Sequence, residues 1–424
     1  MSPRPPPLPS RIWKTPVKNP PVPAPRRPTP LRRADIPPAT APPRRAPGTK
    51  AVLNAVLDHG PVARSTVARL TGLSPASVTG HSAHLLARGL VRESPETTGP
   101  RGLGRPHVPV DIDTGRHLVA GAHIAVTNST LSLMDLRGRI VAEDRRPHQD
   151  IRPRPGAVLD SLAERLPRLV SAHAGGRSVL ALGVATGHRV DPGAGVIVRH
   201  PQLGWRHVAV RDHLADATGL PVHVDSHARA LARAEQLVGE ASTRGSAVLL
   251  FVGAVVDAAF ATAGEVHLGP RHGAGSIAHL PVGGDGSLES EVSERAMVRL
   301  AAEQGAPVPS FPALLARAVA GDSRAVELFR RRARLVGRAV ALLLDMFDPE
   351  VVVVVEPGTG LLPYCLDDLR TEVARRSLVC DDPEQAVVAS SFTGSVLATA
   401  GAAVALGALY ADPLGPWPAL TNVS

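Results

Sequence analysis

The stretch at residues 59–93 reads HGPVARSTVARLTGLSPASVTGHSAHLLARGLVRE and decides the fold of the amino-terminal part of the chain. Ser74 is a preferred helix N-cap, and Pro75 follows it at the first helical position, so a helix is expected to begin there. A short turn containing Gly72 separates this helix from the one expected in RSTVARLTG. The pattern predicts a helix-turn-helix, a motif whose second helix enters the major groove of DNA.

The residues on both sides of this stretch complete a winged helix. Before it, AVLNAVLDHG places Val52, Leu53, Val56 and Leu57 on one face of a helix. After it, LVRESPETTGPRGLGRPHVPVDI alternates like two short strands around a loop rich in Gly, Pro and Arg. We therefore expect a winged helix-turn-helix domain over residues 48–112.

The last helix of this domain has two different faces. Val78, Ser82 and Leu85 share a face that can pack inward, and the opposite face is small and polar, as a helix that meets base edges requires. Ordinary solvated residues, and ordinary surface arginines in the loop, are the alternative interpretation. Ala63 stands where a hydroxyl N-cap is usual for the preceding helix. The residues expected to contact DNA are Ser74, Ala76, Ser77, Thr79, Gly80, His81, His84, Arg101 and Arg105.

The formal net charge of +9 is concentrated at the amino end. Residues 1–47 carry ten Lys or Arg, one acid and seventeen Pro, a composition that cannot bury enough apolar surface to fold. We expect a disordered tail that could touch DNA phosphates; a merely solvated tail, or an extension from a misassigned start codon, are alternatives. Residues 48–110 hold seven bases against three acids. Residues 111–424 therefore carry a net charge of −4 and are expected to lie away from DNA.

From residue 116 onward the pattern is α/β and is repeated once. LVAGAHIAV, STLSLMDL and GRIVAED read as a three-stranded meander, followed by a helix at 155–173 and the strand VLALGVAT. AVLLFVG, DAAFATA and GEVHL repeat the meander. We expect two lobes at about 113–240 and 241–393. Gly394–Ala411 is uncharged and rich in small residues, which favours a buried, closely packed helix over a membrane span.

These stretches together resemble the ROK family (repressors, open reading frames, kinases) over about residues 48–410. HGPVARSTVARLTGLSPASVTGHSAHLLARGLVRE looks like its winged helix, LSLMDLRGRIVAE like its first meander, and HPQLGWRHVAVRDHLADATGLPVHVDSHARALA like its central stretch. GPRHGAGSIAHLPVGGDGSLE resembles the segment that holds the family's sugar and zinc site. The resemblance implies an actin-like, ribonuclease H-like ROK domain at 113–424 that binds an effector and dimerises.

A ROK kinase also needs glycine-rich turns for ATP phosphates and an aspartate base, and this sequence departs from each. The first turn reads AHIAVT at 122–127, the second keeps Gly253 but adds Asp257, and the third is Glu356-Pro357. His227 stands in the place of the catalytic aspartate. We therefore expect no kinase activity and no catalytic residue; a sugar kinase that uses an unusual base is the alternative.

The family's sugar site is partly retained. Ser276 replaces its sugar-binding glutamate, whereas His279 and Glu289 match the pattern. A satisfied core histidine and a simple helix-start carboxylate are the alternative interpretations of these two. The cysteines that bind zinc are absent, and one histidine cannot supply the roughly four ligands of a structural site, so no metal and no cofactor are expected. The expected effector-binding residues are Asp225, His227, His279 and Glu289.

The sequence as a whole predicts a DNA-binding transcriptional regulator, in the first place a repressor, that responds to a sugar or sugar derivative. The expected partners are double-stranded DNA, a second copy of the chain and this effector. Two cysteines exclude a disulfide framework, and no membrane or export segment is expected, which together favour the cytoplasm and the nucleoid. A ligand-independent DNA-bound dimer scaffold is a further alternative.

Overall fold

The structure is a computed structural model that describes residues 47–94, 108–239, 241, 245–283 and 286–418. The described residues belong to one compact unit, residues 45–424. Most of the predicted tail, and the wing loop with Arg101 and Arg105, lie outside the described residues. None of the described helices is long and apolar enough to span a membrane.

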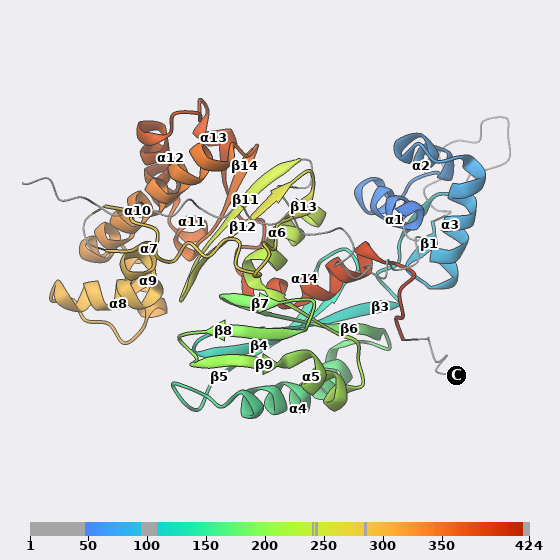
Figure 1. Cartoon of the computed structure of the whole chain (residues 1–424), viewed down its shortest axis with the longest axis horizontal. Coiled ribbons are helices and arrows are strands. Elements are labelled where there is room, and N and C mark those ends of the chain that lie inside the picture. Colours follow the sequence, from blue (N-terminus) through green and yellow to red (C-terminus); the bar gives the residue numbers. More distant parts are fainter. Residues whose placement is uncertain (1–46, 95–107, 240, 242–244, 284–285, 419–424) are drawn as a thin grey trace, which may run out of the picture. The chain divides into compact units, whose positions relative to one another are not determined.

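The predicted winged helix is confirmed (Figure 1). It consists of α1 (Pro47–His59), α2 (Arg64–Thr71), α3 (Pro75–Ala87), β1 (Val91–Glu93) and β2 (Val110–Ile112). The two strands pair antiparallel, as the alternation on either side of the wing loop predicts. As expected, no side chain caps the amino end of α2, whereas the Ser74 side chain caps α3.

The first lobe is built on a five-stranded sheet of order β10-β6-β3-β4-β5. Its strands are β3 (His117–Ile124), β4 (Asn128–Asp135), β5 (Ile140–Pro147), β6 (Ser178–Thr186) and β10 (Val222–Ser226). Helices α4 (Pro155–His173) and α5 (Val210–Thr218) cover one face of this sheet (Figure 1). A small sheet follows, made of β7 (Arg189–Asp191), β8 (Val196–His200) and β9 (Trp205–Ala209).

The second lobe repeats this topology with the order β13-β12-β11-β14-β15. Its strands are β11 (Ser246–Val252), β12 (Val256–Thr262), β13 (Glu265–Val266), β14 (Val351–Val355) and β15 (Val387–Ala389). In both lobes the first three strands are antiparallel and the last two run parallel to the first. The expected duplication is therefore confirmed, although β13 is shorter than the predicted strand GEVHL.

Helices on the two faces of the second sheet enclose two cores. Val248, Leu250 and Val352 face the core that contains α10, and the alternate residues Leu249 and Phe251 face the core that contains α6. The helices of this lobe are α7 (Leu288–Val292), α8 (Glu294–Glu303), α9 (Phe311–Val319), α10 (Ser323–Phe347), α11 (Pro357–Leu361), α12 (Pro363–Arg376) and α13 (Pro383–Ala386). Helix α6 (His227–Val238) follows β10 directly.

The carboxy-terminal helix α14 (Val396–Ala411) packs against the first sheet at backbone distance. A Cβ at Gly121 would lie 2.2 Å from the backbone nitrogen of Ala402, and one at Gly183 would lie 2.3 Å from the carbonyl oxygen of Gly401. Only residues without bulky side chains allow such an approach, which explains the small-residue composition. The prediction of a buried, closely packed helix is confirmed.

The winged helix and the first lobe share one hydrophobic core. Leu53, Leu85, Met134 and Tyr410 belong to the same buried cluster, although they come from α1, α3, β4 and α14. The Tyr410 hydroxyl donates to the carbonyl of Leu136 at 2.7 Å. The winged helix and the first lobe are thus packed together, and the boundary between 112 and 113 stays a prediction.

Candidate functional site

The amino-terminal half of α3 presents a small polar surface to solvent. Ser74 Oγ accepts from the backbone N–H of Ser77 at 3.1 Å and holds the start of the helix. Val78, Ser82 and Leu85 are buried, as predicted from their spacing. The exposed positions are Ser74, Ala76, Ser77, Thr79, Gly80 and His84, and their contact with DNA stays a prediction.

His81 differs from these neighbours because its ring lies against the start of α1. Its Nδ1 is 2.9 Å from Thr49 Oγ1, and a Cβ at Gly48 would lie 2.4 Å from its Nε2. The side chain is half-buried. His81 therefore fixes the beginning of α1 on α3, a contact that sequence spacing could not predict because the partner lies 32 residues away.

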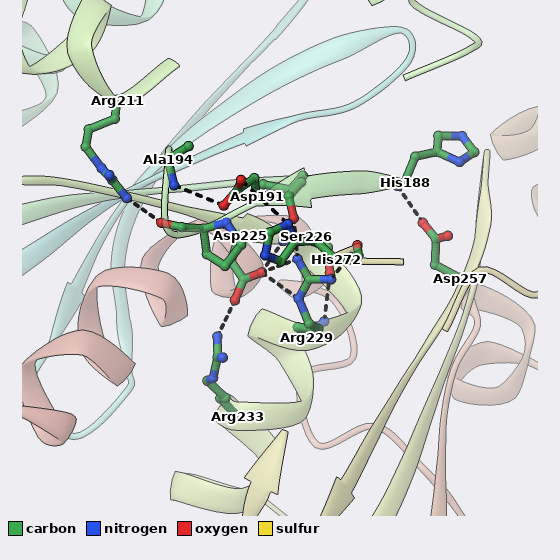
Figure 2. A network of polar contacts seen from close by, with 12 residues as sticks. His188, Asp191, Ala194, Arg211, Asp225, Ser226, Arg229, Arg233, Asp257 and His272 are labelled. Carbon is green, nitrogen blue, oxygen red and sulfur yellow. Dashed lines mark hydrogen bonds and ion pairs between the residues drawn. The ribbon is translucent and has the colours of Figure 1, made fainter. Parts of the chain in front are cut away.

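Asp225 is held by the arginines of the helix that follows it (Figure 2). It is buried, and Oδ1 accepts from Arg229 Nε at 2.7 Å and from the backbone N–H of Ser226 at 2.7 Å. Its other oxygen pairs with Arg233. Both carboxylate oxygens are therefore engaged by arginines within the protein itself.

His227 lies in a buried network with His123 and Asp257. Its Nδ1 is 3.3 Å from His123 Nε2, its Nε2 is 3.3 Å from Asp257 Oδ2, and its ring centroid is 4.0 Å from that of Phe251. Burial lowers the pKa of His123 well below its usual value. Burial alone would raise the pKa of Asp257, but the hydrogen bond and charge of His227 bring it below the usual range.

A cavity of about 70 Å³ lies beside these imidazoles. Residues of the first phosphate turn line it, together with side chains from both lobes; they include His123, Thr127, Asn128, Arg145, His200, His227, Glu294 and Leu397. Burial lowers the pKa of His200 to about 3, and the charge of His188 lowers it further. Burial therefore favours the neutral form of His123 and of His200 on this lining at ordinary pH.

Glu289 joins the same network from the second lobe. Its Oε1 accepts from Gln202 Nε2 at 3.0 Å, and its Oε2 accepts from the backbone N–H of Val256 at 3.1 Å. Gln202 Oε1 lies 2.5 Å from His188 Nε2, and the backbone N–H of His188 donates to Asp257 at 2.8 Å. Glu289 also lies in the first turn of α7, the position that the alternative of a helix-start carboxylate predicts.

His279 is exposed, so the alternative of a satisfied core histidine is wrong. Asp225, His227 and Glu289 thus lie in buried or half-buried polar networks, whereas His279 lies at the surface. Their role in effector binding stays a prediction. No group of three or more His, Cys, Asp or Glu side chains within the described ranges could hold a metal ion.

A buried ion pair occupies the third phosphate turn. Arg332 Nη1 lies 2.7 Å from Glu356 Oε1, and both side chains are buried. Glu356 Oε2 also accepts from the backbone N–H of Thr359 at 2.7 Å and so caps α11. Arg332 stacks over the ring of Phe311. The chain's own charges therefore fill this turn.

The sequence pattern of the ROK family matches residues 119–408, which covers nearly all of both lobes and most of α14. The chain belongs to the ROK family. A protein of Mycobacterium tuberculosis named a transcriptional regulator is 35% identical to this ROK chain in an alignment of 385 residues that covers 86% of each chain. The N-acetylglucosamine repressor of Escherichia coli O157:H7 is 24% identical over 77% of this chain and 85% of its own.

A solved structure shares the fold. The crystal structure of a ROK family transcriptional regulator, described as a homologue of the Escherichia coli MLC protein, superposes with a TM-score of 0.71 at 22% identity. The match covers 86% of this ROK chain and 96% of the other. The winged helix followed by two actin-like lobes is therefore the fold of this ROK protein.

Four residues of the buried network were missed as site residues by sequence reasoning. His123 and Asp257 were identified in the sequence only as departures from the phosphate turns of a kinase. His188 and Gln202 do not belong to any of the motifs used to predict site residues. His188 has a left-handed backbone (φ 63°), which is uncommon for a residue with a side chain. Gln202 lies within HPQLGW, so the match of that stretch to the family could have pointed to it.

Proposed function

We propose that this ROK protein is a DNA-binding transcriptional regulator that reads double-stranded DNA with α3. The observation that carries the proposal is the exposed, small and polar amino-terminal half of α3, capped by Ser74 within a winged helix. Such a surface can approach base edges in the major groove. The names of the relatives agree with this function.

A gel-shift titration of the full chain tests this function. Double-stranded fragments from upstream of its own gene should be retarded at low salt, with affinity falling as salt rises. Failure to retard any such fragment at low salt counts against the proposal. Because winged-helix readers address paired half-sites, we also propose a homodimer, which light scattering coupled to size exclusion tests by mass.

We propose that the chain has no kinase activity. Phosphoryl transfer depends on positioned groups that stabilise the negative charge of the phosphates. Here Asp257 and Glu356 place carboxylates at two of the phosphate turns, and His123 and His227 are stacked on each other at an interplanar angle of 6°. Incubation with ATP, magnesium and a panel of hexoses and N-acetylhexosamines should yield no sugar phosphate; measurable product would overturn the proposal.

We propose that the cavity beside His227 is the effector site. We also propose that α14 moves when a ligand occupies this cavity and transmits the movement to the winged helix. Leu397 near the start of α14 lines the cavity, and Tyr410 near its end lies in the core shared with α1 and α3. Beyond α14, the Gly415 carbonyl accepts from Arg88, the residue that follows α3, at 2.8 Å. A shift of α14 on ligand binding would therefore displace α3.

Thermal-shift screening separates this regulated form from a ligand-independent scaffold. A sugar that binds the folded protein raises its Tm with ligand concentration. If the same sugar also weakens or strengthens the gel shift, the cavity and the DNA-reading surface are coupled. A Tm response without any change in DNA affinity would contradict the proposed route through α14.

A further inference from the structure

One turn of the first lobe reaches the winged helix with a charged side chain. Arg137 lies in the turn between β4 and β5, and its guanidinium pairs with the carboxylate of Asp111 in β2. Its Nη1 also donates to the carbonyl of Leu57, near the end of α1, at 3.3 Å. Arg137 therefore joins the first lobe to two separate elements of the winged helix.

The backbone of this turn is fixed from the side of the first lobe. Asp135 Oδ1 accepts from the backbone N–H groups of Arg137 and Arg139, at 2.9 and 3.0 Å. The hydroxyl of Tyr410, near the end of α14, donates to the carbonyl of Leu136 at 2.7 Å. The position of the Arg137 backbone is therefore set by the first sheet and α14, and not by the winged helix.

Asp111 receives this arginine inside the winged helix. It is buried, and its Oδ1 also accepts from the backbone N–H of Ile112 at 2.8 Å. Its partner in register on β1 is Arg92, whose Nη2 lies 4.0 Å from Oδ2 and whose side chain is 55% exposed. Arg137 is the nearer and the more buried of these two cations, with 25% of its side chain exposed. The cation from the first lobe is therefore the stronger partner of Asp111.

This ion pair differs from the apolar packing that surrounds it. The winged helix and the first lobe share a buried cluster that includes Leu53 and Met134. Apolar burial is not directional, whereas a charge-assisted hydrogen bond fixes both a distance and an angle. A second polar contact lies at the end of α3, where His117 Nε2 is 3.0 Å from the carbonyl of Arg88. Polar contacts at two separate points, β2 and the end of α3, determine an orientation that apolar packing alone does not.

We propose that Arg137 is a positioning residue for DNA reading: through Asp111 it holds β2, and with it the winged helix, at one orientation to the first lobe. Without this contact the held orientation is less populated, and the apparent DNA affinity falls in proportion to its population. The inference rests on the proposed DNA-binding function. It concerns the strands of the winged helix, whereas the movement of α14 proposed above acts on α3.

The double variant Arg137→Met/Asp111→Asn of the full chain removes both charges together. Replacing both partners of an ion pair is close to neutral for stability, whereas Arg137→Met alone leaves the buried Asp111 carboxylate without its nearer cation. We expect the double variant to keep the Tm of the parent and to bind a specific fragment about 10-fold more weakly in a gel shift. Arg299→Met removes an exposed ion pair with Glu303 on α8; it is the matched control and should bind as the parent does. Unchanged DNA affinity of the double variant overturns the proposal.

The salt dependence of the gel shift separates positioning from direct contact. Each Lys or Arg that neutralises a DNA phosphate contributes about one unit to the slope of log affinity against log salt. If Arg137 acts through Asp111, the double variant keeps the slope of the parent at a lower affinity. A slope smaller by about one unit would show that Arg137 itself contacts a phosphate and would overturn the proposal.

A distance measurement reports on the orientation in the absence of DNA. Nitroxide spin labels are attached at Ala83→Cys in α3 and Arg168→Cys in α4, both exposed positions, and their separation is measured by pulsed electron paramagnetic resonance. The background carries Cys380→Ser, because Cys365 is buried and Cys380 is not. With Arg137 and Asp111 intact we expect one narrow distance distribution, and with both replaced a broader one. Equal widths overturn the proposal.

The DNA-binding function can be judged separately from this inference. If the parent chain retards specific fragments and the double variant retards them equally, the role of Arg137 is wrong and the regulator stands. If the parent chain retards no fragment, the proposed DNA-binding function fails, and the two distance distributions still decide whether Arg137 orients the winged helix.

Discussion

Replacing Gly80 by Glu changes the surface of α3 without disturbing its packing. Gly80 is exposed on α3, and a Cβ there would meet nothing within 4 Å. Because glycine costs about 1 kcal/mol relative to alanine within a helix, Gly80→Glu should leave the stability unchanged or slightly higher. The new carboxylate would face DNA phosphates, and like charges brought together across an interface cost several kcal/mol.

We therefore expect Gly80→Glu to weaken specific DNA binding by at least about 100-fold, equivalent to about 2.7 kcal/mol. Gly156→Glu is the matched control, because Gly156 also lies in a helix, α4, with nothing within 4 Å of an added Cβ, and receives the same charge. Gel-shift titrations and thermal denaturation of both variants give the comparison. Equal DNA affinity of the two variants would refute the assignment of α3 as the reading helix.

Three further predictions concern the tail, the buried ion pair and pH. Deleting residues 1–47 should lower DNA affinity and the salt slope but leave the preferred site unchanged, because its ten Lys or Arg act without sequence preference; a changed footprint would show that the tail reads bases. Arg332→Met should destabilise the fold by about 3–5 kcal/mol in denaturant titration, because it leaves the buried Glu356 carboxylate without its ion-pair partner. The double variant Arg332→Met/Glu356→Leu should recover most of this lost stability. Destabilisation by the double variant equal to that by the single one would contradict the account. Burial lowers the pKa of His200 to about 3 in the folded protein, against 6.5 in the unfolded chain. The unfolded chain therefore binds more protons between these two pH values, so the free energy of unfolding falls as the pH drops below 6.5. His200→Gln should flatten that fall, and an unchanged pH profile would argue against a buried neutral His200.

The sequence predicted those elements whose signals are local. Ser74-Pro75 placed the start of α3, and the helix predicted at 155–173 has the bounds of α4. The uncharged, small-residue stretch at 394–411 gave the buried α14, because a helix that approaches a sheet at backbone distance needs small side chains. The duplication of the α/β unit followed from two similar meanders.

The site was harder to predict because its contacts are long-range. His123 and His227 are 104 residues apart, and Gln202 and Glu289 are 87 apart, so no periodicity connects them. The pairing of Asp225 with Arg229 was within reach, since their i, i+4 spacing at the start of a helix permits it. That Asp225 is paired with two arginines, and so differs from a free ligand carboxylate, required the folded helix.

The most direct test of the central claim is a footprinting titration of the full chain on the region upstream of its own gene, at low and at physiological salt. The account predicts a protected site that persists at physiological salt and is lost in Gly80→Glu but retained in Gly156→Glu. Absence of any protected site at low salt, or protection that Gly80→Glu leaves intact, would contradict it.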